Sequence, residues 1–189
     1  NANTQFLVGT GIFRESSVYP GDLSYLRASA QFNLSHSSQD KRFSMDLSTS
    51  FANEDNKLPS LDLAAYMNLP PNFPSLRDSL GKLNWQENGI SFSSLNITNP
   101  LSYLVQKYNS ESSNLLSSLR LNFKIAKGLE LTTNLGYTQT QNRETSTSPS
   151  TSYDPQLGIL PSAHFLTGLM KGWTIEPRLQ YSSSIATNN

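Results

Sequence analysis

Several absences narrow the classes to which this chain of 189 residues can belong. It contains no cysteine, which excludes disulfide bonds and cysteine-ligated metal sites. Only 15% of its residues are charged, and 14 basic residues balance 14 acidic ones. This neutrality argues against nucleic acid as a partner, because nucleic-acid-binding proteins carry a basic patch. No run of about 18 apolar residues is present either, so we expect no transmembrane helix.

The start of the chain also lacks familiar features. The segment NANTQFLVG has neither the basic beginning nor the apolar centre of a signal peptide, and the first residue is not methionine. We therefore expect a processed form, or an excised part of a longer protein. Serine, threonine and asparagine replace most of the missing charge. Such a mixture suits a wall with one lipid face and one wet, uncharged face, and it also suits a secreted β-sandwich.

The clearest pattern is the hairpin from Asn114 to Gln139. Before its turn, leucine, phenylalanine and isoleucine recur at every second position, and polar residues fill most of the gaps. The same alternation resumes after the connection 126–128, where Gly128 can adopt a positive φ. Alternation with period two indicates strands that have one apolar and one polar face. Each strand is about ten residues long, as a tilted strand needs to cross a bilayer.

Further stretches repeat this unit, so we predict an all-β fold. It is an antiparallel meander of about six long strands that forms part of a transmembrane β-barrel. Pro177 falls within the last strand, where we expect an irregularity because proline cannot donate a ladder hydrogen bond. The predicted strands are residues 4–13, 25–35, 42–52, 114–125, 129–139 and 173–181.

The connections between these strands alternate in length. Residues 36–41 and 126–128 are short links, which we assign to the periplasmic side. Residues 14–22, 53–113 and 140–172 are longer and would lie outside the cell. The first half of the last loop is of low complexity, and we expect it to be mobile. Within 53–113, Asn99 and Pro100 predict a helix start, followed by an apolar stripe that extends to Tyr108.

The face assignment yields three groups of candidate residues. The charges on the polar faces would line the lumen, where they would contact a plug or substrate or simply pair across strands: Arg27, Asp46, Arg120, Lys124, Glu130, Glu176 and Arg178. Aromatic residues near both ends of the apolar rows would form membrane girdles: Phe43, Phe51, Tyr137, Trp173 and Tyr181. Loop aromatics could stack on substrate or only pack the loop: Trp85, Tyr103 and Tyr108.

Catalytic, cofactor and metal sites have little support. His36, Ser37 and Asp40 could be drawn as a triad, but a polar turn explains them better. Gly9-Thr-Gly11 lacks the third glycine of a dinucleotide motif. Glu54-Asp55 could hold a metal, although a solvated loop charge explains them better. We therefore predict no catalytic residue, cofactor or metal ligand.

Several short segments, spread over nearly the whole chain, carry a family resemblance: Tyr25-Leu-Arg27 leading into Phe32-Asn33-Leu34, Gly81-Lys-Leu-Asn84-Trp85, Asn99-Pro100-Leu101, Lys127-Gly128-Leu129 with Leu135-Gly136-Tyr137, and Trp173-Thr-Ile-Glu176-Pro177. Together they resemble the SusC/RagA-type TonB-linked outer membrane transporters. The resemblance implies a large barrel, an N-terminal plug, a SusD-like lipoprotein lid, and TonB-powered uptake of glycans or peptides across the outer membrane.

Six strands are too few to close a known single-chain barrel. No plug or TonB box is visible, so these residues alone could not perform energised transport. We expect a segment of an outer membrane importer whose partners are lipid, the rest of the barrel and the plug. Two alternatives stay open: a soluble β-sandwich for binding or adhesion, and a small pore built from several copies. An enzyme is a remote fourth reading.

Overall fold

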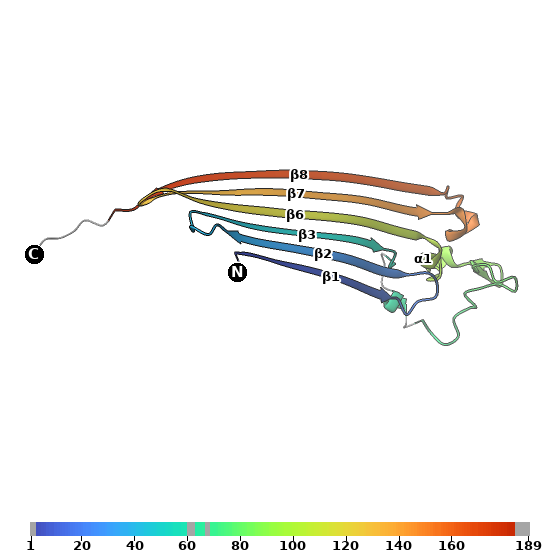
Figure 1. Ribbon diagram of the computed structural model, residues 1–189. Coiled ribbons are helices and arrows are strands. Elements are labelled where there is room, and N and C mark those ends of the chain that lie inside the picture. Colours follow the sequence, from blue (N-terminus) through green and yellow to red (C-terminus); the bar gives the residue numbers. More distant parts are fainter. Residues whose placement is uncertain (1–2, 60–62, 67–68, 184–189) are drawn as a thin grey trace, which may run out of the picture.

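The computed structural model describes residues 3–59, 63–66 and 69–183. Its main element is a six-stranded antiparallel meander in which each strand pairs with the next (Figure 1). The predicted all-β meander of six strands is therefore confirmed. In order across the sheet, the strands are β1 (Thr4–Ser16), β2 (Ser24–Ser37), β3 (Phe43–Asn56), β6 (Lys107–Ala126), β7 (Leu129–Ser148) and β8 (Ser162–Tyr181).

Smaller elements lie in the connections. The loop between β3 and β6 contains a short ribbon, β4 (Gln86–Glu87) and β5 (Ile90–Ser91), and one helical turn, α1 (Ser102–Val105). Four 3₁₀ turns complete the described part: η1 (Leu63–Tyr66), η2 (Phe92–Leu95), η3 (Ser150–Ser152) and η4 (Pro155–Leu157). Across the three described ranges, no helix has both the length and the apolar character needed to cross a membrane.

The last three strands are much longer than predicted. β6, β7 and β8 each have 20 residues, so most of the expected loop 140–172 is wrong. Residues 140–148 extend β7, and residues 162–172 belong to β8. The loop 53–113 likewise shortens to 57–106, within which residues 60–62 and 67–68 lie outside the described part.

The prediction missed these extensions because neither shows an apolar–polar alternation. Residues 139–148 are polar at every position, yet their backbone pairs with β6 on one side and β8 on the other. Residues 162–172 instead place apolar side chains on both faces, including Phe165 and Leu166. Backbone pairing stabilises a strand whatever its side chains, so periodicity detects only strands with unlike faces.

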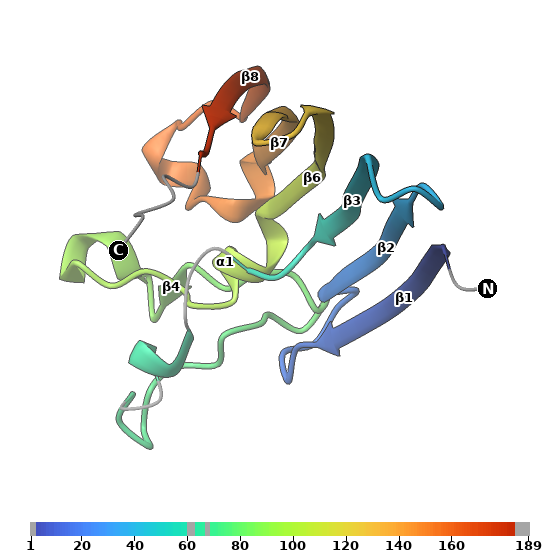
Figure 2. The same cartoon turned by 60° about the vertical axis from the view of Figure 1, so that its left-hand side comes forward.

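The alternation of short and long connections holds after this correction. Residues 38–42 and 127–128 turn at one end of the sheet, and residues 17–23, 57–106 and 149–161 turn at the other. β1 begins and β8 ends beside the short turns, whereas the loops gather beside α1 at the opposite end (Figures 1 and 2). The two ends of the sheet are therefore built very differently.

Two local predictions are wrong. β8 keeps an unbroken register through Pro177, which lies opposite Thr133. β8 is an edge strand, and a proline whose nitrogen faces the open edge removes no ladder hydrogen bond. The expected helix after Asn99 is a single turn, and Tyr108 belongs to β6 because Lys107 already pairs with β7.

The sheet has no core of its own among the described residues. Among the described residues, the buried apolar side chains are Phe92 and Pro100, both in the long loop. Large apolar side chains on the sheet are exposed instead, such as Trp173 at 76% and Ile175 at 69%. A β-sandwich would bury such side chains between two sheets, whereas the described strands form one layer. The apolar face therefore needs cover that the described residues do not supply.

The turn at Gly128 provides a test of this geometry. Gly128 has a φ of +79°, and a Cβ there would overlap the carbonyl oxygen of Ser182. Gly128→Ala should therefore lower the free energy of unfolding by more than about 1 kcal/mol, measured by urea titration in detergent. Gly168→Ala is the control, because a Cβ at Gly168 meets nothing within 4 Å. Equal stability of the two variants would contradict the turn geometry.

Candidate functional site

The pairing register separates the sheet into two unlike faces. Paired residues lie on the same face, so the apolar row of one strand continues into the row of the next. Phe43 lies opposite Phe123, and Leu47 lies opposite Leu119. Leu135 of β7 then lies opposite Ile175 of β8. One face of the sheet therefore carries a continuous apolar band.

The apolar band has the same width on most strands. On four strands, the first and last residues of its rows are eight positions apart: Leu26–Leu34, Phe43–Phe51, Leu129–Tyr137 and Trp173–Tyr181. At ~3.3 Å per residue step, such a row is about 26 Å long. On β6 the row extends from Leu115 to Ile125, with a register irregularity between Lys124 and Ala126. Residues beyond these limits towards the loops are mainly polar or charged on β3, β6 and β7.

The band is also oblique to the rows of paired residues. Consider first the border near the loops, where Phe51 ends the band on β3. The residues paired with Phe51 across the sheet are Ala30 on β2 and, through β6 and β7, Lys171 on β8. On β2 the band ends at Leu26, four residues closer to the loops than Ala30, and on β8 it ends at Trp173, two residues farther from the loops than Lys171. At the border near the short turns, Phe43 ends the band on β3. On β2 the band ends at Leu34, four residues farther from the short turns than the position opposite Phe43, and on β8 it ends at Tyr181, two residues closer to them than Leu179, which lies level with Phe43. Both borders of the band therefore shift by six residues, four plus two, between β2 and β8, which are four strands apart in the sheet. With ~4.8 Å between strands, this corresponds to a tilt of roughly 45°.

The girdle candidates lie at these borders. Phe43 and Tyr181 lie near the short turns, whereas Phe51, Tyr137 and Trp173 lie near the loops. The rings of Tyr137 and Trp173 lie 4.5 Å apart between centroids, and the Tyr137 hydroxyl donates to Gln139 Oε1 over 2.7 Å. Gln139 is the first residue beyond the band on this strand, so the ring is apolar-facing and its hydroxyl points to the polar side of the border.

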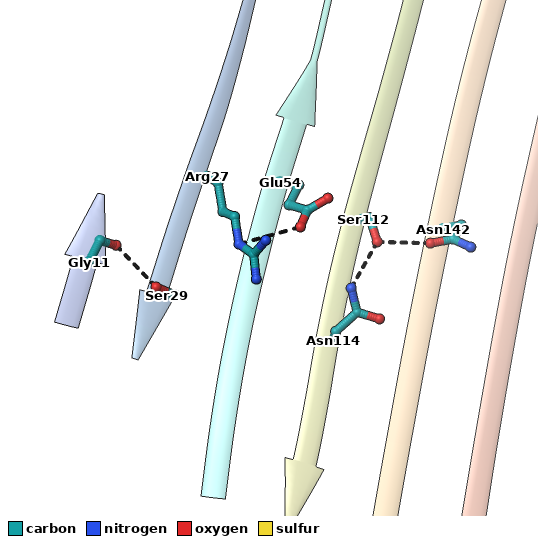
Figure 3. Close-up of polar contacts among 7 residues, drawn as sticks. All are labelled: Gly11, Arg27, Ser29, Glu54, Ser112, Asn114 and Asn142. Carbon is teal, nitrogen blue, oxygen red and sulfur yellow. Dashed lines mark hydrogen bonds and ion pairs between the residues drawn. The ribbon is translucent and has the colours of Figure 1, made fainter. Parts of the chain in front are cut away.

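The opposite face carries mostly uncharged polar groups, several of which bond across strands. Ser112 donates to Asn142 Oδ1 over 2.9 Å, and Asn114 Nδ2 donates to Ser112 Oγ over 3.2 Å (Figure 3). Ser48 donates to Asn33 Oδ1 over 2.7 Å. A groove of about 710 Å³ follows this face across the first five strands of the sheet. The polar face of the sheet is therefore a surface that water can wet, rich in hydroxyl and amide groups.

All seven charged candidates share this polar face. Arg27 pairs with Glu54 over 3.5 Å, and Arg120 Nε donates to Asn134 Oδ1 over 3.1 Å (Figure 3 shows the first contact). No ion pair joins two of the candidates to each other within the described ranges, although the register sets Asp46 opposite Arg120 and Lys124 opposite Glu130. Glu176 lies opposite Asn134, and Arg178 lies opposite Thr132. Glu54 is a strand residue of β3, so its reading as a loop charge is wrong.

The loops at one end form a small folded cap, which we define as residues 69–106 and 149–161. Every fully or nearly fully buried residue of the described part belongs to it: Ser91, Phe92, Asn99, Pro100, Ser102, Ser152 and Asp154. Asn99 is 0% exposed, and its Nδ2 donates to the carbonyl oxygens of Leu76 and Asn84. Its Oδ1 accepts from the backbone N–H of Leu101. One satisfied amide thus holds three passes of the chain together.

Asp154 links the two loops of the cap. Its Oδ2 accepts hydrogen bonds from Ser91 Oγ and Ser93 Oγ, and its Oδ1 accepts from the backbone N–H of Gln156. Burial raises the pKa of Asp154, but these hydrogen bonds outweigh it and hold the pKa below its ordinary value. The carboxylate therefore stabilises the cap in its charged form.

The three substrate-loop candidates separate in the structure. Tyr103 in α1 receives a hydrogen bond of 3.2 Å from the hydroxyl of Tyr66. This bond and partial burial raise the pKa of Tyr103, so it is part of the loop packing. Tyr108 is a strand residue on the polar face, opposite Ser146. Trp85 lines a pocket between the two loops of the cap.

This cap pocket has a volume of about 690 Å³. Besides Trp85, its charged and aromatic lining consists of Arg77, Asp78, Lys82, Tyr153 and Asp154. Sequence reasoning found Trp85 alone. The other residues stand in segments with no periodic pattern. The two sides of the pocket come from residues 77–105 and 150–159, which are far apart in the chain. Only the contact between the loops brings them together.

The structure does not join His36, Ser37 and Asp40 into a catalytic triad. His36 Nδ1 bonds Thr4 Oγ1 over 2.7 Å, whereas Asp40 accepts from Ser38 and from the backbone N–H of Arg42. His164, expected in a loop, is a residue of β8 opposite Ser146. Within the ranges that the structure describes, no group of three histidine, aspartate or glutamate side chains is placed to hold a metal ion.

Comparisons with known proteins add no assignment. No protein-family model matches the chain, and no curated protein is significantly similar to it in sequence.

Asp154 gives a prediction on the cap. Asp154→Asn keeps the shape but replaces one acceptor oxygen by a donor, so the cap should lose about 1–3 kcal/mol of local stability. Hydrogen exchange of the amides in 69–106 at pH 7 measures this loss. Asp46→Asn is the control, because Asp46 has no side-chain partner among the described residues.

The same carboxylate predicts a pH dependence. Since the folded pKa of Asp154 is lowered, its contribution is present above the unfolded pKa of about 3.9 and is lost as the pH falls through the lower folded value. The difference in exchange between the wild type and Asp154→Asn should therefore vanish in acid. A difference that persists unchanged below both pKa values would contradict the charged role of Asp154.

Proposed function

We propose that this chain is a segment of the wall of an outer membrane β-barrel that imports nutrients, of the SusC-like, TonB-dependent type. The apolar band is the observation that carries the membrane part of this proposal. A membrane demands an apolar surface of constant height around the barrel, whatever the register of the strands. A tilted strand therefore meets each border at a different residue from its neighbour. The shift of six residues over four strand steps is what such tilted strands require.

The dimensions of the band agree with this interpretation. A row of about 26 Å, inclined by roughly 45°, has a height of about 18 Å between its end Cα atoms. Side chains at both borders extend this height towards the ~25 Å apolar belt of outer membrane barrels. The aromatic residues at the borders supply rings of the kind that gather at both interfaces.

The polar face and the loops support passage of a solute. Hydroxyl and amide groups follow the sheet from the cap to the short turns, so a hydrated molecule finds partners along the wall. The large loops lie at one end only, as on the outer side of such barrels. The resemblance of the sequence to SusC/RagA-type transporters extends this proposal to glycans or peptides as cargo, with a plug, a SusD-like lipoprotein and TonB as partners.

The open edges of the sheet indicate that the wall is incomplete. β1 and β8 each have one unpaired edge among the described residues, and a bilayer does not tolerate unpaired backbone groups. Further strands must therefore cover both edges. We propose that they belong to the same large barrel, whereas a pore made of several copies of this chain would cover them by pairing β8 of one copy with β1 of the next.

A charge placed in the band tests the membrane assignment. Leu121→Arg introduces a cation near the middle of the apolar row, which should cost about 2–4 kcal/mol of folding stability in lipid vesicles. Ser118→Arg is the matched control on the polar face and should cost much less. A neutral effect of Leu121→Arg, measured by urea titration in vesicles, would refute the lipid-facing assignment.

The absence of cysteine allows a second test with single labels. Leu119→Cys should react slowly with a water-soluble maleimide in intact outer membranes, because the thiol is surrounded by lipid. Ser118→Cys, one residue away on the polar face, should react at least about tenfold faster in the same membranes, since only a wetted thiol ionises readily. Equal rates would place both faces in the same medium and oppose the proposal.

The parent mass separates a large barrel from an oligomeric pore. Mass spectrometry of the polypeptide in native outer membranes should give a value several times 20.9 kDa for an importer. A polypeptide near 20.9 kDa that forms a discrete oligomer in detergent would favour the pore instead.

A further inference from the structure

The cap pocket contains unsatisfied donors beside aromatic rings. The side chain of Lys82 makes no ion pair or hydrogen bond with a described residue, and the guanidinium of Arg77 makes one hydrogen bond, from Nη1 to the carbonyl oxygen of Gly81. The indole N–H of Trp85 and the hydroxyl of Tyr153 have no hydrogen-bond partner among the described residues either. Four donor side chains therefore line one pocket with most of their capacity unused.

The acceptors of the pocket are largely engaged. Asp154 is 3% exposed, and both of its oxygens accept hydrogen bonds from the protein. Oδ1 of Asp78 accepts from the backbone N–H groups of Leu80 and Lys82, which leaves Oδ2 as the one open carboxylate oxygen. The four charged side chains of the lining therefore balance in net charge, but the hydrogen-bonding groups left open to a ligand are mainly donors, on Arg77 and Lys82.

This balance selects a class of ligand. A carboxylate is the natural partner of a guanidinium and an ammonium group, because its two oxygens accept charge-assisted hydrogen bonds. The faces of Trp85 and Tyr153, together with the apolar side chains of Val105 and Ile159, favour a ligand body with an apolar ring face. We propose that the cap pocket binds a carboxylate-bearing small molecule with such a face. An acidic sugar and the carboxyl end of a short peptide both fit this chemistry.

The inference names the substrate class of the proposed importer and rests on it for its biological meaning, but the binding can be measured without transport. The pocket lies in the cap, where the three long connections emerge from the sheet, so a molecule held there stands at the outer end of the polar face. The pocket would capture the ligand before it meets the wettable wall.

Isothermal titration of the intact protein in detergent tests the proposal with two matched pairs of probes. Glucuronate is compared with glucose, and the dipeptide Phe-Gly is compared with its C-terminal amide. We expect the carboxylate member of at least one pair to bind tenfold or more tightly than its neutral partner. Preference within the sugar pair alone identifies an acidic sugar, and preference within the peptide pair alone identifies a peptide carboxylate. Preference within both pairs supports recognition of the carboxylate itself.

Variants locate the binding. Lys82→Gln should reduce the preference for the carboxylate at least about threefold without changing the affinity for the neutral probe, because Lys82 has no structural contact to lose. Trp85→Ala should weaken the preferred probe and its neutral partner together. Lys127→Gln, in the short turn at the other end of the sheet, is the control and should leave every affinity unchanged.

Several results would overturn the inference: no binding of any probe at 10 mM, on the order of the weakest affinities of interest, equal affinity within both pairs, or an unchanged preference in Lys82→Gln. These outcomes differ from a failure of the proposed function. The thiol-labelling and Leu121→Arg results report on the membrane and do not depend on the cap pocket, so each proposal can fail alone.

Discussion

A pleated strand turns successive side chains to opposite faces, and the rest of this structure depends on that constraint. Where the six strands alternate in this way, they produce a sheet with one apolar and one polar surface, although residues 162–172 of β8 carry apolar side chains on both faces. Large apolar side chains are exposed on the sheet, and the buried apolar side chains among the described residues, Phe92 and Pro100, both belong to the cap. The strands are therefore held together by backbone pairing, while their apolar side chains are not covered by any described part of the chain. In the function that we propose, a bilayer would cover them and, by excluding water, would strengthen the hydrogen bonds of the ladder.

The cap is stabilised in a different way. Its chain runs through turns in which only Phe92 and Pro100 of the apolar side chains are buried, so packing alone does not order it. Polar side chains carry the order instead, with Asn99 bonding three passes of the chain and Asp154 bonding the two loops to each other. Such groups are stabilising only when all of them find partners, because an unpaired buried polar atom costs more than a satisfied one contributes. The cap can therefore keep a defined pocket at the mouth of the sheet without a hydrophobic core.

In the function that we propose, the two halves of the structure have different roles. The sheet offers a long surface of hydroxyl and amide groups, several of which bond across strands. The donors of the cap pocket have few partners among the described residues. In the proposed importer, selective binding at the cap and weak, repeated contacts along the sheet would first hold a solute and then release it inward.

The sequence by itself determined which residues share a face, because the direction of a side chain along a strand depends only on the local backbone. The seven lumen candidates and the five girdle candidates could be grouped for this reason. The lengths of the strands were harder to predict from the sequence. Residues 139–148 are polar throughout, and residues 162–172 have apolar side chains on both faces, so neither segment shows an alternation. Only their pairing with neighbouring strands makes them strands. Tertiary structure alone decided the register, and with it the oblique band of constant width. It also decided the cap pocket, since the contact of Asp154 with Ser91 joins segments that no local pattern connects. Local geometry depends on neighbouring residues, whereas register and loop contacts depend on residues that are far apart in the chain.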